Sequence, residues 1–200
     1  MDAILENIVR HITLNAAEQS DFLSLLKPKK IGKKQLLSQE GDISKGAFFV
    51  TAGILRSYAI DKNGFEHIVQ FAPPGWWITD MYSLITRQPG SLNIDAIEDS
   101  ELLLLQKDDL ELLYKRIPSF ERFFRILAEN ALVTFQQRLI DNLSLSARER
   151  YENFCRRYPQ LIKCLPQKQV ASYIGVTPEF LSKMLKSRVA APANNERKKS

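Results

Sequence analysis

The sequence has little cysteine and histidine and no long apolar run. Its two cysteines, Cys155 and Cys164, are too few for a disulfide framework or a metal cluster. Its two histidines, His11 and His67, are isolated from each other, and isolated histidines are more often ordinary surface or core residues than metal or haem ligands. No stretch approaches the roughly 18 consecutive apolar residues of a membrane-spanning helix. We therefore expect no metal, no cofactor and no membrane partner.

Motifs of catalysis are also missing. The sequence has no nucleophile elbow, no glycine-rich phosphate loop, no H-E-x-x-H and no cluster of Cys with His. Paired acids such as Asp108 with Asp109 are explained as cap or solvated positions. The first residues, MDAILENIVRHI, carry acids where a signal peptide would carry a positive cluster. We expect a cytoplasmic protein that is not an enzyme.

Glycine is scarce after residue 90, where only Gly175 occurs, but seven of the eight glycines punctuate the first half. Between them stand short segments rich in β-branched, aromatic and alternating residues, such as AFFVTAG and FEHIVQF. This spacing predicts an α+β chain whose residues 1–117 form an antiparallel β jelly-roll barrel. A helical segment over residues 2–26 is expected to pack on the barrel through Ile4, Ile8, Ile12, Phe22, Leu25 and Leu26.

Residues 118–145 predict one long helix, with Pro118 near its start and no internal glycine or proline. A long helix with an apolar stripe usually needs a partner, so we expect a homodimer in which this helix meets its twofold mate. The alternative is that the stripe covers only the barrel of its own subunit. The stripe consists of Phe120, Phe124, Leu127, Ala131, Phe135 and Leu139.

Residues 146–188 predict a helix-turn-helix domain that binds double-stranded DNA. Its helices lie within 167–188, where apolar residues recur at helical spacing before and after Gly175. Gly175 can adopt the left-handed conformation of a tight turn, Thr177 can cap the second helix and Pro178 suits its first position. Ser146 is expected to cap the helix that opens the domain. The inner faces are predicted to be Val170, Ala171 and Ile174 against Leu181, Met184 and Leu185.

The second helix of such a motif presents its outward residues to base edges in the major groove. Charged residues at the margins are better placed for phosphates, which position a protein without reading sequence. The alternative is an ordinary helical hairpin with a solvated basic face. The expected base-reading residues are Thr177, Pro178, Glu179, Ser182 and Lys183, and the expected phosphate contacts are Gln167, Lys168, Lys186 and Arg188.

The net charge is positive only in the C-terminal quarter of the chain. Residues 146–200 hold 12 Lys or Arg against 4 Asp or Glu, whereas residues 1–145 hold 16 against 19. A basic end on an acidic body predicts salt-sensitive DNA binding. Residues 189–200 are expected to be a flexible basic tail that adds at most nonspecific phosphate contacts.

The order of these parts resembles the Crp/Fnr family of bacterial transcription regulators. The resemblance implies a cyclic-nucleotide-binding-like barrel, a dimerisation helix and a winged helix-turn-helix that acts on RNA polymerase at promoters. Residues 158–167 are too short for the usual β-wing, so we expect the wing to be reduced or absent. The resemblance rests on Glu40-Gly41-Asp42, FFVTAGILRSYAIDKNGFEHIVQF, PGWWITDMYSL and QVASYIGVTPEFLSKML.

The ligand site departs from the family pattern. Members that bind cyclic AMP have a glycine-glutamate pair for the ribose and, further on, an arginine followed by a small hydroxyl residue for the phosphate. Here Thr79-Asp80 resembles the first pair only loosely, and Ser91-Leu92 replaces the second. Because a neutral group does not replace the arginine, a weak cyclic-AMP response or none is expected.

Another small-molecule effector remains open in this region. An aromatic wall with a few polar groups describes many ligand sites. The alternative is that both tryptophans serve only core or interdomain packing. For the whole chain, the alternative to a DNA-binding regulator is a ligand-binding or scaffolding barrel without specific DNA binding. The residues expected to line the pocket are Trp76, Trp77, Asp80, Tyr82, Ser91 and Asn93.

Overall fold

The computed structural model describes the backbone of residues 2–189 and the side chains of residues 2–187. The chain packs as two compact units, Met1–Gln137 and Arg138–Ser200. The division falls inside the long helix α5 (Ser119–Ser144). The predicted basic tail, apart from the backbone of Val189, lies outside the described residues, and so does the side chain of Arg188.

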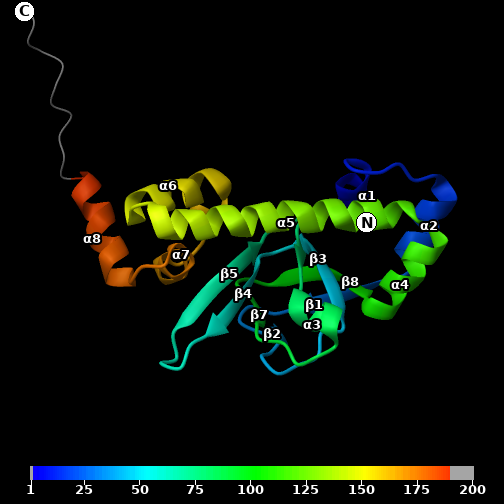
Figure 1. The fold of residues 1–200 in the computed structure, drawn as a ribbon, viewed down its shortest axis with the longest axis horizontal. Helices are drawn as coiled ribbons and strands as arrows, with labels where there is room; N and C mark the ends of the chain where they lie inside the picture. Colours follow the sequence, from blue (N-terminus) through cyan, green and yellow to red (C-terminus); the bar gives the residue numbers. More distant parts are fainter. Residues whose placement is uncertain (1, 190–200) are drawn as a thin grey trace, which may run out of the picture. The chain divides into compact units, whose positions relative to one another are not determined.

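The first unit contains two four-stranded sheets in which every pairing is antiparallel (Figure 1). This arrangement, with helices before and after it, confirms the predicted α+β fold with an antiparallel barrel. One sheet has the order β1 (Leu26–Ile31), β8 (Ser100–Gln106), β3 (Gly46–Ala52) and β6 (Trp77–Ile78). The other has the order β2 (Leu36–Ser38), β7 (Asn93–Ala96), β4 (Leu55–Ile60) and β5 (Glu66–Ala72).

The first sheet is apolar on both faces. Successive side chains in a strand point to opposite sides, and β3 carries apolar residues at consecutive positions. Phe48 and Val50 of β3 join Leu55 and Ile94 of the second sheet in a core between the sheets. Phe49, which lies between them in sequence, joins a second core on the opposite face, together with residues of the flanking helices. The short helix α3 (Met81–Thr86) lies between β6 and β7 along the chain.

Helices α1 (Asp2–Val9), α2 (Ala16–Ser24), α4 (Lys107–Arg116) and the start of α5 supply the second core. The N-terminal segment was predicted as one helical stretch but consists of two helices. The first ends at Val9, and Asn15 starts the second: its side chain accepts from the Glu18 backbone N–H, while the Glu18 carboxylate accepts from the Asn15 N–H. The predicted contacts on the barrel are confirmed, since Ile4, Ile8, Ile12, Phe22 and Leu26 are buried in this core and Leu25 packs against it.

A buried ion network ties the second sheet together across three strands. Arg56 of β4 is only 8% exposed and donates through Nε and Nη2 to the two carboxylate oxygens of Asp95, at 2.7 and 2.8 Å. Its Nη1 donates to Glu66 at 2.6 Å. Burial alone would lower the pKa of Arg56, but the hydrogen bonds to Asp95 and Glu66 raise it above its ordinary value. Arg56 is therefore held as a cation.

Within residues 138–189 the second unit contains helices only, so the wing that the Crp/Fnr resemblance implies has no strand in this range. After the end of α5 come α6 (Ala147–Arg157), the short 3₁₀ helix η1 (Leu161–Lys163), α7 (Gln167–Ile174) and α8 (Pro178–Val189). Ser146 caps α6 as predicted and forms a reciprocal pair with Glu149. The rings of Phe154, Tyr158 and Tyr173 pack against one another in tilted and edge-on arrangements in the interior of this unit.

Candidate nucleic-acid interface

The apolar residues predicted at the crossing of α7 and α8 are buried. Val170 and Ile174 are each 2% exposed, and Ala171 and Leu181 are fully covered. Ala171 has the small side chain that lets the two helix backbones approach. Met184 and Leu185, further along α8, are half-buried. The two helices therefore form one packed unit with a defined inner side.

The turn between the two helices has the predicted conformation. Gly175 adopts φ 72° and ψ 42°, the left-handed region, and its N–H donates back to Ala171 and Ser172 of α7. The Thr177 hydroxyl oxygen accepts from the Phe180 N–H at 3.2 Å and caps α8, while Pro178 takes the first helical position. The start of α8 is thus fixed by its own sequence.

The outward face of this unit carries most of the predicted DNA contacts. Thr177, Glu179 and Lys183 are exposed at the start and on the first two turns of α8, whereas Pro178 and Ser182 are half-buried. Gln167, Lys168 and Lys186 are exposed at the margins. One exposed residue on this face was missed by sequence reasoning, which considered mainly polar residues: Phe180 is 52% exposed.

Two arginines fasten the C-terminal end of α7. Arg138, from the last part of α5, donates through Nη2 to the Tyr173 carbonyl at 2.9 Å, and its guanidinium lies 4.0 Å from the centre of the Tyr173 ring. Arg150 of α6 donates through Nε to the Ile174 carbonyl at 2.8 Å. Burial lowers the pKa of Arg138. Positive groups at the last carbonyls of a helix offset its negative end, so both arginines stabilise α7 where the turn begins.

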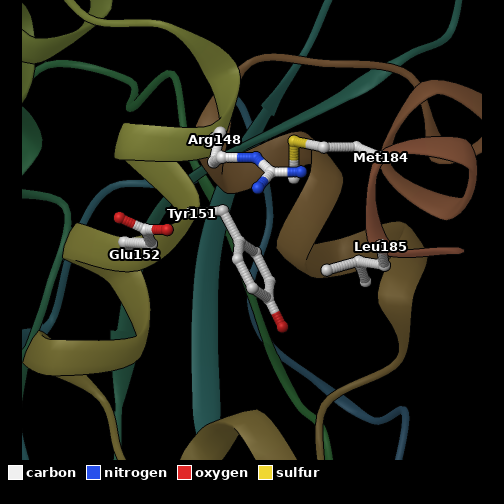
Figure 2. A pocket seen from close by; sticks show the side chains of 5 residues that line it. All are labelled: Arg148, Tyr151, Glu152, Met184 and Leu185. Atoms are coloured by element: carbon white, nitrogen blue, oxygen red, sulfur yellow. The ribbon is translucent and has the colours of Figure 1, made fainter. Parts of the chain in front are cut away.

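The side of α8 opposite the proposed reading face packs toward α6. A small pocket there is lined by Arg148, Tyr151 and Glu152 of α6 and by Met184 and Leu185 of α8. Figure 2 shows the Arg148 and Met184 side chains extending toward each other across it. Its position marks the inner side of α8, where Met184 and Leu185 face α6.

Helix α5 has two apolar faces rather than the single predicted stripe. Phe120 is buried in the core of the first unit, where Phe124 and Leu127 pack against it. Further along the helix, Ala131, Phe135 and Leu139 are exposed. The later residues of the predicted stripe are exposed because the core of the first unit covers only the first part of α5. The exposed apolar side chains of α5 are Leu132, Val133, Phe135, Leu139, Ile140 and Leu143, here called the α5 stripe.

The residues expected to line a ligand pocket come together only in part: Asp80 contacts the backbone of Ser91, but the two tryptophans pack against different cores. Trp76 packs against the core between the sheets, whereas Trp77 packs against the opposite core, beside Phe49 and Phe124. Tyr82 and Ser91 are exposed. Asn93 is 5% exposed, and its side-chain oxygen accepts from the Glu40 N–H at 3.1 Å. Trp76 precedes β6 and Trp77 begins it, and because the two side chains pack against different cores they do not form one wall.

Asp80 instead organises the loops around α3. One of its carboxylate oxygens accepts from the Ser83 N–H at 3.1 Å, and the other accepts from the N–H groups of Ser91 and Leu92 at 2.9 and 3.0 Å. A Cβ on Gly90 would lie 2.5 Å from Asp80, so glycine is needed for this close approach. By the family resemblance, Ser91 and Leu92 belong to the segment that would hold a cyclic phosphate. Their backbone N–H groups already donate to the Asp80 carboxylate.

Neither a metal site nor a membrane span emerges from the part of the chain that is described. No group of three or more His, Cys, Asp or Glu side chains there could hold a metal ion. None of its helices is both long and apolar enough to cross a bilayer.

Comparison with known proteins agrees with this architecture. Residues 28–116 match the family described as cyclic nucleotide-binding domain. The chain is 23% identical over 185 residues to the regulatory protein HlyX of Actinobacillus pleuropneumoniae, covering 86% of this chain and 76% of HlyX. These residues therefore carry a domain of the cyclic nucleotide-binding family, in a chain whose relatives are named as regulators.

Solved structures with the same fold include FixK2 of Bradyrhizobium japonicum, with a TM-score of 0.72, 17% identity and coverage of 85% of this chain and 89% of FixK2. A crp/fnr-family regulator from Eubacterium rectale matches with a TM-score of 0.70 and 15% identity, covering 88% of this chain and 84% of that protein. The resemblance to Crp/Fnr regulators predicted from the sequence is confirmed.

Proposed function

We propose that this chain is a homodimeric, cytoplasmic DNA-binding transcription regulator of the Crp/Fnr type that acts on RNA polymerase at promoters. A small molecule other than cyclic AMP controls it through the barrel. The observation that carries the proposal is the α7–α8 unit: a capped helix with a buried apolar back and an exposed face bearing Glu179 and Lys183. Such a helix fits the major groove with its N-terminal turns at the base edges.

Each exposed group of α8 has a chemical role in this proposal. The Lys183 ammonium donates to the acceptor edge of guanine, and the Glu179 carboxylate accepts from the cytosine amine. Ser182, which is half-buried, can donate or accept. Lys168 and Lys186 lie at the margins and contact phosphates, which adds affinity without reading sequence.

The α5 stripe supplies the dimer contact. Six large apolar side chains exposed along one helix are more than a monomeric surface usually leaves uncovered in one place. Leu132, Leu139 and Leu143 recur at spacings of seven and four, which places them on one side of α5. Pairing of two such helices around a twofold axis would present two copies of α8 to successive major grooves.

Control by cyclic AMP is disfavoured by the contacts of Asp80. A cyclic phosphate at this position would meet a carboxylate that already holds the N–H groups of Ser91 and Leu92. Two anions cannot share these donors without strong repulsion. Any effector must therefore bind in another way, and it can shift the protein only by its difference in affinity between two conformations.

Selection of bound fragments from random duplex DNA tests the proposal. We expect enrichment of a near-palindromic site and a steep fall in affinity as salt rises. Ser182→Ala combined with Lys183→Ala should lower affinity for the enriched site and leave the dimer intact, while Lys62→Ala, at an exposed turn of the barrel unit, serves as the control. Lys168→Ala should reduce the salt slope of the dimer by roughly two, because one ammonium group in each subunit no longer neutralises a phosphate.

Failure to enrich any sequence, together with weak and salt-insensitive DNA binding, would contradict the proposal. In that case the chain would fit a ligand-binding or scaffolding barrel.

A further inference from the structure

Helix α8 exposes a large aromatic side chain in its first turn. Phe180 is 52% exposed, whereas the next residue, Leu181, is fully buried in the unit. The Phe180 backbone N–H is held by the capping oxygen of Thr177 at 3.2 Å, so this position is part of the defined start of the helix. An aromatic ring left half in water contributes less to folding than a buried one, which points to a role outside the packing of the unit.

Phe180 shares its side of the helix with polar residues of the proposed reading face. Lys183 and Ser187 follow it by three and seven residues, a spacing that places all three along one side of α8. Both are exposed. Met184, four residues after Phe180, lines the pocket toward α6, so Phe180 lies at the edge between the packed side and the exposed side of α8. An apolar group therefore stands beside a lysine at the edge of the surface that would enter the major groove.

We propose that Phe180 reads the methyl group of thymine in the major groove. This inference rests on the proposed DNA-binding function and deepens it by assigning one base preference. Thymine alone among the four bases carries a methyl group on its major-groove edge, and phenylalanine is among the side chains that contact it. Because Phe180 lacks a polar side-chain atom, it can favour a base only through apolar contact. Lys183, three residues on, reads a neighbouring base pair.

The test starts from the site enriched by the selection experiment. Each thymine is replaced in turn by deoxyuridine, which removes only the methyl group. Affinities of both duplexes are then measured for the native chain, Phe180→Ala, Phe180→Leu and the control Phe65→Ala. Phe65 is a suitable control because it is 67% exposed but lies between β4 and β5.

At one thymine in each half-site we expect the native chain to lose roughly fourfold in affinity for every methyl removed. Phe65→Ala should lose the same factor. Phe180→Ala should bind the two duplexes equally, and Phe180→Leu, which keeps a shorter apolar side chain, should give an intermediate ratio. Because each ratio is taken within one variant, a general loss of affinity or stability cancels.

An equal thymine-to-uracil ratio in the native chain and Phe180→Ala would overturn this inference while leaving DNA binding intact. So would an enriched site in which no thymine methyl affects affinity. Failure to enrich any site would overturn the proposed function and this inference with it.

Discussion

Replacing Leu139 with alanine tests whether the α5 stripe holds two chains together. Leu139 is 60% exposed, so a partner helix could cover about three-fifths of its side chain. Complete burial of a leucine side chain stabilises by about 1.5–3 kcal/mol, which gives about 1–2 kcal/mol for the exposed part. Twofold symmetry places the residue in the interface twice, so the two copies contribute about 2–4 kcal/mol to each dimer.

Because alanine keeps only the Cβ atom, the lower part of this range, about 2–3 kcal/mol, should be lost from the dimer. The dissociation constant should therefore rise roughly 30- to 140-fold, since about 1.4 kcal/mol corresponds to a factor of ten. Sedimentation velocity over a concentration series measures this change directly. The control is Ile85→Ala, because Ile85 is 67% exposed on α3, away from the stripe.

Two results would refute this reasoning. One is a dimer whose dissociation constant is unchanged by both Leu139→Ala and Leu132→Ala. The other is a native chain that sediments as a monomer at every concentration.

Substitutions at four further residues probe the two units. Asp80→Ala should lower the free energy of unfolding by about 2–4 kcal/mol in a urea titration, because three backbone N–H groups lose their acceptor, and Asp80→Asn, which keeps one oxygen, should lose less. Arg56→Met should cost about 3 kcal/mol or more by the same assay, since it leaves two carboxylates without their cation, and an unchanged midpoint would contradict the ion network. Arg138→Met should destabilise the second unit by about 1–3 kcal/mol in thermal unfolding followed by aromatic fluorescence, and Arg138→Lys should recover part of the loss. Burial raises the pKa of Tyr114 to about 12, so the neutral phenol contributes fully to the free energy of unfolding below pH 10, and this contribution should be lost as the pH rises from 10 to 12. In Tyr114→Phe the free energy of unfolding should therefore fall less over the same pH range.

Local signals in the sequence were sufficient for the α7–α8 unit. Gly175, Thr177 and Ser146 each act through their own backbone or the next turn, so their type and position determine the turn and the caps. The N-terminal break was also predictable, because Asn15 followed by Glu18 is a capping-box pattern. It was missed because the apolar spacing continued through it.

Other features depend on which surface covers a residue, and spacing alone does not contain that information. Phe120 and Leu139 fit one stripe by sequence, yet Phe120 is buried in the first unit and Leu139 is exposed. Trp76 and Trp77 are adjacent in the sequence and suggest one aromatic wall, yet they pack against two different cores. Phe180 could be recognised as a surface residue only once the packing of Leu181 was known.

The arginine contacts at the end of α7 have a mechanical consequence. Arg138 belongs to the long helix and Arg150 to the helix after it, yet both hold consecutive carbonyls, those of Tyr173 and Ile174. A rotation of the last turns of α5 would therefore move α7 directly, through the hydrogen bond from Arg138 to the Tyr173 carbonyl. The motion would not have to be transmitted through the short connection at Leu145 and Ser146. A conformational change that reached the end of α5 would therefore rotate α7 and α8 together as a rigid body. The affinity for DNA could then change without unfolding of either helix.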